Sequence, residues 1–137
     1  MNSMQIKLCD IQGRLFELSL EKGFDSTEFV KQFMNSKIAA YLDSIYNRMQ
    51  WAGEEYLLAE IADECGLKRG GKLLTKDELF WMGYLYRYWH FHTGESSKKI
   101  YKQANIATMR VNYLMFHTMS PEMAIEDLKE ICRQKKN

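Results

Sequence analysis

The residues best suited to chemistry lie in one aromatic stretch of the chain and directly after it. Arg87 and His90 are one helical turn apart, so they share a face if this stretch is a helix. A serine-capped helix after it would present free backbone N–H groups, which hold an anion, and a lysine would add charge. The pattern predicts a phosphate or nucleotide site made of Arg87, His90, Ser96, Ser97 and Lys98.

A structural interpretation of the same residues competes with the anion site. An arginine on an aromatic helix is rarely buried unless it is paired with an acid. Arg87 would then be a buried or half-buried cation, and Ser96 would only cap a helix. The acids expected as partners of Arg87 are Glu54, Glu55 and Glu95.

A basic loop is the second candidate site. Residues 58–72 resemble the first helix and turn of a DNA-binding helix-turn-helix, with Ala62 four residues before the turn glycine Gly66. Gly70-Gly71 would fall inside the recognition helix, where glycine is unfavourable. Any helix that ends at a glycine also shows a similar sequence pattern. DNA or RNA recognition therefore stays an alternative function, with phosphate contacts expected from Lys68, Arg69 and Lys72.

Metal and nucleophile chemistry find no support in the spacing of the sequence. His90 and His92 would point about 200° apart on a helix and could share an ion only on a strand. The three cysteines are widely separated, form no C-x-x-C pair and suit small apolar positions. We therefore predict no metal, no cofactor and no catalytic residue, and we favour a binding protein over an enzyme.

One element must position the candidate residues, a helix expected over about 76–93. Thr75 and Glu78 have the spacing of a capping box, and Gly94 follows as a C-cap. Aromatic groups point almost all round this helix, so it must be covered on most sides, and Gly83 indicates close approach of another backbone. A strand is the alternative, because tyrosines and histidines also alternate there, and the charges argue against a membrane span.

The whole chain predicts an all-α fold. Its 137 residues suit a single compact multi-helix domain, residues 1–137, in which residues 1–23 are a candidate for a peripheral N-terminal helix. A net charge of +1 removes the general argument for nucleic-acid or membrane-surface binding. Three unpaired cysteines and an N-terminus without a signal-peptide pattern indicate the cytoplasm.

Four segments carry a resemblance to a group of short helical bacterial proteins. They are NRMQWAGEEY at 47–56, the aromatics at 84–89, TGESSKKIY at 93–101 and FHTM at 116–119. The resemblance extends over about 29–131 and leaves the first helix outside it. Proteins of that group are similar to antitoxin-like partners encoded near toxin genes, so the resemblance implies a protein-binding role with a toxin as the partner, and it carries no catalytic residues.

The leading hypothesis is therefore a cytoplasmic protein–protein interaction module, of the antitoxin-like kind. Aromatic and methionine side chains are enriched in the centres of interfaces. The contact patch is expected among Tyr41, Tyr46, Met49 and Trp51.

Overall fold

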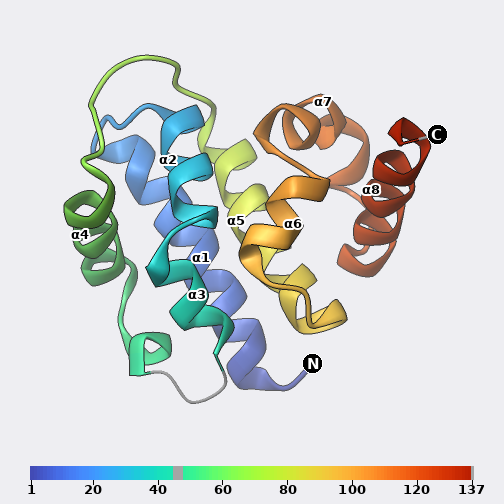
Figure 1. Cartoon of the computed structure of the whole chain (residues 1–137), viewed down its shortest axis with the longest axis horizontal. Helices are drawn as coiled ribbons and strands as arrows, with labels where there is room; N and C mark the ends of the chain where they lie inside the picture. Colours follow the sequence, from blue (N-terminus) through green and yellow to red (C-terminus); the bar gives the residue numbers. More distant parts are fainter. Residues whose placement is uncertain (45–47, 137) are drawn as a thin grey trace.

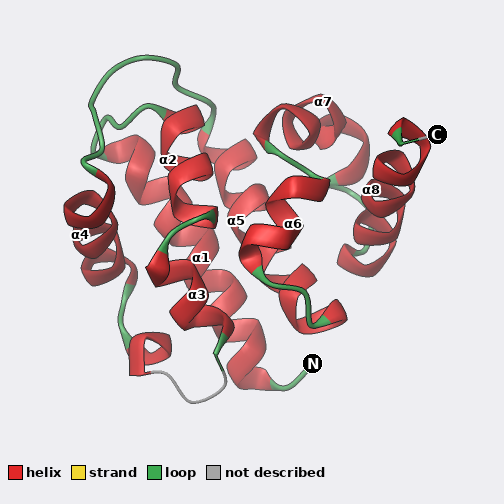
Figure 2. Ribbon diagram, in the orientation of Figure 1, coloured by secondary structure: helices red, strands yellow, loops and turns green. Residues whose placement is uncertain are grey.

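The computed structural model describes residues 1–44 and 48–136, and the side chains of all of these except residues 48 and 49. Within these ranges the regular elements are helices, and the only β-type pairing is one isolated bridge between Phe24 and Arg69 (Figure 2). The all-α prediction is confirmed. The elements are α1 (Ser3–Glu21), α2 (Ser26–Met34), α3 (Lys37–Asp43), the 3-10 helix η1 (Arg48–Trp51), α4 (Glu54–Cys65), α5 (Lys76–Thr93), α6 (Ser97–Gln103), α7 (Ile106–Phe116) and α8 (Pro121–Lys135).

The centre of the fold is the pair α1 and α5, which makes the most extensive helix contact in the described chain. Figure 1 shows the two helices side by side, with α4 on one flank and α7 and α8 on the other. The short helices α2, α3 and α6 lie in front of the pair in that view. Phe16 of α1 packs edge-on against Phe29 and Phe33 of α2, with ring centroids 5.3 and 5.4 Å apart, which joins α2 to the core.

Glycine allows α1 and α5 to approach closely. A Cβ built on Gly83 would lie 2.5 Å from the backbone oxygen of Gln12 and 2.9 Å from Cγ of Phe16. On the other helix, a Cβ on Gly13 would lie 2.7 Å from the ring of Phe80. The Gln12 side chain uses this proximity, since its Nε2 donates a 2.9 Å hydrogen bond to the Gly83 oxygen. The close backbone approach predicted at Gly83 is confirmed.

The N-terminal helix belongs to the core. Leu15 and Phe16 are fully buried, and Gln12 and Ser19 are buried with their polar atoms bonded inside the protein. A peripheral position for residues 1–23 is therefore wrong. The physical reason is the close contact with α5, because a glycine on each helix removes the side chains that would otherwise keep the two backbones apart.

The ends of α5 follow local rules that the sequence displays. Thr75 Oγ1 accepts from the backbone N–H of Glu78, and Glu78 Oε1 accepts from that of Thr75, both at 3.2 Å. Gly94 closes the helix with a φ of 80°, in the left-handed region that favours glycine. The helix predicted over 76–93 is confirmed, and the strand alternative is wrong.

Replacing Gly83 with alanine tests the close crossing. The added methyl would collide with the backbone of Gln12, which cannot move like a flexible side chain, so we expect Gly83→Ala to lower the free energy of unfolding by about 2 kcal/mol despite better helix propensity. Gly53→Ala is the control, because nothing lies within 4 Å of its Cβ and the expected loss there is about 0.5 kcal/mol. Urea unfolding of both variants measures the difference, and a Gly83→Ala protein as stable as the original would contradict a tight crossing.

Candidate functional site

Arg87 lies in the interior, where its side chain is only 1 % exposed. Nε donates to Oε1 of Gln12 at 2.8 Å, Nη1 to Oδ1 of Asp43 at 2.6 Å and Nη2 to Oγ of Ser97 at 3.1 Å. Burial lowers the pKa of the guanidinium, and the charge and hydrogen bond of Asp43 oppose that shift. Each nitrogen of the guanidinium is thus bonded within the protein, and the head group joins α1, α3, α5 and α6.

The anion of this cluster is the carboxylate of Asp43. Its Oδ2 accepts the backbone N–H of Ser97 at 2.9 Å, and its Oδ1 accepts the Ser97 hydroxyl at 2.8 Å. His90 Nδ1 lies 3.6 Å from the same carboxylate and 2.7 Å from the Glu95 carbonyl oxygen. The first turn of α6 therefore binds an anion, as such a turn can, and that anion belongs to the protein itself.

The predicted phosphate site is thus brought together only in part. Arg87, His90 and Ser97 converge, but Asp43 occupies the position where a phosphate was expected. Ser96 caps α6 by accepting the backbone N–H of Lys99 at 3.1 Å, and the Lys98 side chain is exposed. The interpretation of Arg87 as a buried structural cation fits this geometry. Its partner is Asp43, however, and none of the three acids that were expected, Glu54, Glu55 and Glu95.

The basic loop does not form a recognition helix. Gly70 and Gly71 have φ values of 87° and 70°, and residues 67–74 run as an irregular segment. Hydrogen bonds tie this segment to the turn between α1 and α2, among them Ser26 N–H to the Lys72 oxygen at 2.7 Å and Gly70 N–H to the Gly23 oxygen at 2.8 Å. The helix-turn-helix prediction for 58–72 is therefore wrong, and Lys68, Arg69 and Lys72 are exposed loop cations.

The predicted contact patch lies partly on the surface. Tyr41 on α3 and Trp51 on η1 are both exposed. Tyr46 and the side chain of Met49 lie outside the described residues. Among the described residues, no group of three or more His, Cys, Asp or Glu side chains is placed to hold a metal ion.

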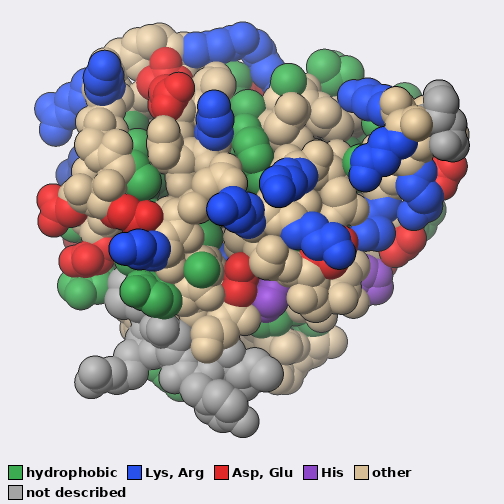
Figure 3. Space-filling model, in the orientation of Figure 1, with side chains coloured by type: hydrophobic (Ala, Val, Ile, Leu, Met, Phe, Trp, Pro, Cys, Tyr) green, Lys and Arg blue, Asp and Glu red, His purple; other side chains and the backbone are tan. Residues whose placement is uncertain are grey.

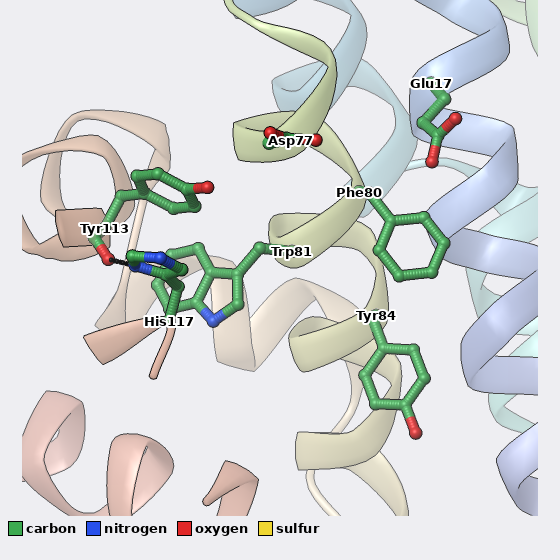
Figure 4. A pocket seen from close by; sticks show the side chains of 7 residues that line it. All are labelled: Glu17, Asp77, Phe80, Trp81, Tyr84, Tyr113 and His117. Atoms are coloured by element: carbon green, nitrogen blue, oxygen red, sulfur yellow. Dashed lines mark hydrogen bonds between the residues drawn. The ribbon is translucent and has the colours of Figure 1, made fainter. Parts of the chain in front are cut away.

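An aromatic groove crosses the outer face of α5, between α1 and α7 (Figure 4). Phe80 and Tyr84 point toward α1, whereas Trp81 points toward Tyr113 and His117 of α7. The Trp81 and Tyr113 rings meet edge-on with centroids 5.6 Å apart, and Tyr113 stacks on His117 at 4.3 Å. The cavity measures about 560 Å³, within the size range of ligand and peptide sites.

The edge of this groove is acidic. Glu17 and Asp77 line it, and none of the Lys or Arg residues in the described part of the chain does. Glu17 has a cation at 3.6 Å, the Nζ of Lys76, while Asp77 has no ion pair within 4.0 Å among the described residues. Burial raises the pKa of Tyr113, and the negative charges of Asp77 and the neighbouring Glu78 raise it further. The groove therefore suits an apolar group that carries positive charge at its edge.

A second surface feature is an apolar stripe on α7. Val111, Leu114 and Met115 are 83 %, 82 % and 72 % exposed. They are spaced by three and four residues, so they form one continuous face of the helix. A helix that is apolar nearly all round normally has no face in water. The apolar character of residues 106–116 is visible in the sequence, but the sequence does not tell which side of the helix remains uncovered.

Comparisons of the chain with family models, curated proteins and solved structures find no match. None of the helices among residues 1–44 and 48–136 combines the length and the apolar character needed to cross a bilayer. The groove, the stripe and the charges are the features of this surface that bear on function.

Removing the charge of Asp43 tests whether the arginine cluster is structural. Asp43→Asn leaves the buried guanidinium without its counter-ion, so we expect a loss of about 3 kcal/mol in the free energy of unfolding. Asp127→Asn on the exposed face of α8 is the matched control, with an expected change within about 0.5 kcal/mol. Equal stability of the two variants in urea would show that Arg87 does not depend on this pair.

Glu95 provides a prediction for the dependence of stability on pH. Burial opposes its ionisation, but hydrogen bonds from Lys129, Trp89 and Gln103 outweigh it and lower the pKa of Glu95 from 4.5 to about 2. Because the folded-state pKa is the lower one, the ionised carboxylate stabilises the fold above pH 4.5, and this contribution is lost as the pH falls toward 2.

We therefore expect the stability difference between the original protein and Glu95→Gln to be largest at neutral pH, at roughly 2 kcal/mol after allowance for solvent screening. It should shrink as the pH falls from 4.5 toward 2. Denaturant titrations at several pH values measure it, with Glu55→Gln at an exposed position as the control. A difference that does not change with pH would contradict the assigned pKa of Glu95.

Proposed function

We propose that this protein is a protein–protein interaction module whose partner covers the outer face of α7. The observation that carries the proposal is the apolar stripe of Val111, Leu114 and Met115. Burying a side chain of this size is worth about 1.5–3 kcal/mol relative to leaving it in water, so a partner that covers all three gains several kcal/mol. Contiguous apolar patches on a folded chain are characteristic of protein contact sites.

The aromatic groove supports the same proposal, because α7 forms one of its walls. Tyr113 and His117 face the groove, and Leu114 follows Tyr113 on the next position of the helix, so groove and stripe border one another. Trp and Tyr in partly buried pockets are the residues that most often dominate binding energy. A partner segment that places an apolar side chain over Trp81 and a basic one beside Asp77 fits the shape and charge of this surface.

The narrower proposal is an antitoxin-like protein of the bacterial cytoplasm with a toxin as its partner. Its support is the resemblance of segments within 29–131 to proteins of that kind. The cysteines Cys9, Cys65 and Cys132 are free thiols, which agrees with a reducing compartment. Tyr41 and Trp51 offer further exposed aromatic contacts on the α3 and η1 side.

Site-specific photo-crosslinking in the native host tests the proposal. A crosslinking residue at Leu114 should trap one protein partner, whereas the same residue at Ala59, exposed on α4, should trap none. Val111→Ser with Leu114→Ser should then weaken binding of the trapped partner at least about tenfold while the thermal midpoint stays unchanged or rises.

Tyr56→Ser is the matched control, since Tyr56 is an exposed apolar side chain on another helix. A partner that binds the Val111/Leu114 double variant as well as the original protein would contradict the assignment of the surface. Light scattering would identify the remaining case, in which the trapped partner is a second copy of this chain.

A further inference from the structure

Five basic side chains line one cleft between α6 and α8. Figure 3 shows Lys and Arg side chains gathered over these two helices. The cleft has a volume of about 330 Å³ and also includes Glu95, Gln103 and Cys132. We call it the basic cleft, and its cations are Lys99, Lys102, Lys129, Arg133 and Lys136.

Positive charge is concentrated at this cleft. Its five cations and one acid give a net charge of +4, whereas the whole chain has a net charge of +1. The rest of the molecule is therefore negative overall. A field of one sign inside a concave, low-dielectric surface attracts an oppositely charged ligand more strongly than the same charges spread over a convex face.

The one acid in the cleft is already satisfied. Glu95 Oε1 accepts from Trp89 Nε1 at 2.9 Å and from Lys129 Nζ at 2.7 Å, and Oε2 accepts from Gln103 Nε2 at 2.8 Å. Lys129 Nζ also donates to Gln103 Oε1 at 3.0 Å and lies 5.8 Å from the centroid of the Trp89 ring. Glu95 thus fixes Lys129 at the base of the cleft, and its single charge offsets only one of the five cations.

The remaining cations keep donors for a ligand. Lys102 and Lys136 have no ion pair within 4.0 Å among the described residues. Lys99 lies 3.8 Å from Glu95, and Arg133 pairs with Glu130 on the exposed side of α8. Exposed pairs of this kind are weak, so an anion with several charges can compete for these two side chains.

We propose that the basic cleft binds a compact anion with two or three linked phosphate groups, such as a free diphosphate or triphosphate. Flexible ammonium groups and one guanidinium from two helices can reach phosphate oxygens on several sides. The volume of the cleft, at the lower end for ligand sites, matches a group of this size. The cleft shares no lining residue with the apolar stripe or the aromatic groove, so this inference does not depend on the proposed protein contact.

Calorimetric titration with inorganic tripolyphosphate and pyrophosphate at low salt tests the inference on the full chain. We expect binding that weakens as salt is added, and a loss of affinity of at least about tenfold in the variant Lys102→Glu with Lys136→Glu. The matched control is Lys68→Glu with Lys72→Glu, which makes the same change of net charge in the basic loop and should alter affinity less than about threefold. Thermal melting without ligand checks that both variants are folded.

Several outcomes would overturn the proposal. One is the absence of any heat or thermal shift with tripolyphosphate, and another is an equal loss of affinity in both double variants, which would indicate attraction by net charge alone. A third is tight binding of a short DNA duplex together with no binding of tripolyphosphate. If Lys68→Glu with Lys72→Glu abolished that duplex binding, the loop of residues 67–74 would be the nucleic-acid contact instead.

Discussion

The close crossing of α1 and α5 is the constraint on which the other features depend. Because Gly83 carries no side chain, the Gln12 side chain can donate a hydrogen bond to the Gly83 carbonyl oxygen of α5. It also accepts a hydrogen bond from Nε of Arg87, one helical turn further along. The guanidinium is thereby buried, and a buried cation requires a counter-ion. Asp43 supplies it from α3 and binds the first turn of α6 with the same carboxylate. One tight helix contact thus leads to the placement of two further helices.

The same constraint determines which surfaces remain for function. The side of α5 that carries Gly83 and Arg87 is taken up by α1 and by the arginine cluster. Next to it, Phe80 and Tyr84 point toward α1 and Trp81 points toward α7, and these three side chains line the groove. The end of α5 is held by Glu95, which bonds side chains of α6 and α8. The apolar stripe lies on α7 and the basic cleft between α6 and α8, whereas the aromatic groove lies on α5 itself, with α1 on one side and α7 on the other.

Local signals in the sequence predicted the bounds of α5, because caps and helix-ending glycines act within a few residues, as at Thr75 and Gly94. The cluster around Arg87 could not be derived in this way. Asp43 lies 44 positions away, and its choice over nearer acids depends on how α3 packs. The helix-turn-helix prediction failed for a similar reason, because its sequence pattern describes only a helix closed by glycine. The segment that follows bonds instead to the turn at Gly23 and to Ser26, the first residue of α2. The exposed side of α7 likewise depends on packing.

Native-state hydrogen exchange of the backbone amides tests the central claim most directly. If the α1–α5 pair is the structural centre, the amides around Gln12 and Gly83 should exchange only through global unfolding and show the same highest free energy of opening. The amides of α4 and α8 should open at lower free energy. Exchange of the α1 amides by a separate, lower-energy opening, with α5 still protected, would contradict the account and return the N-terminal helix to a peripheral role.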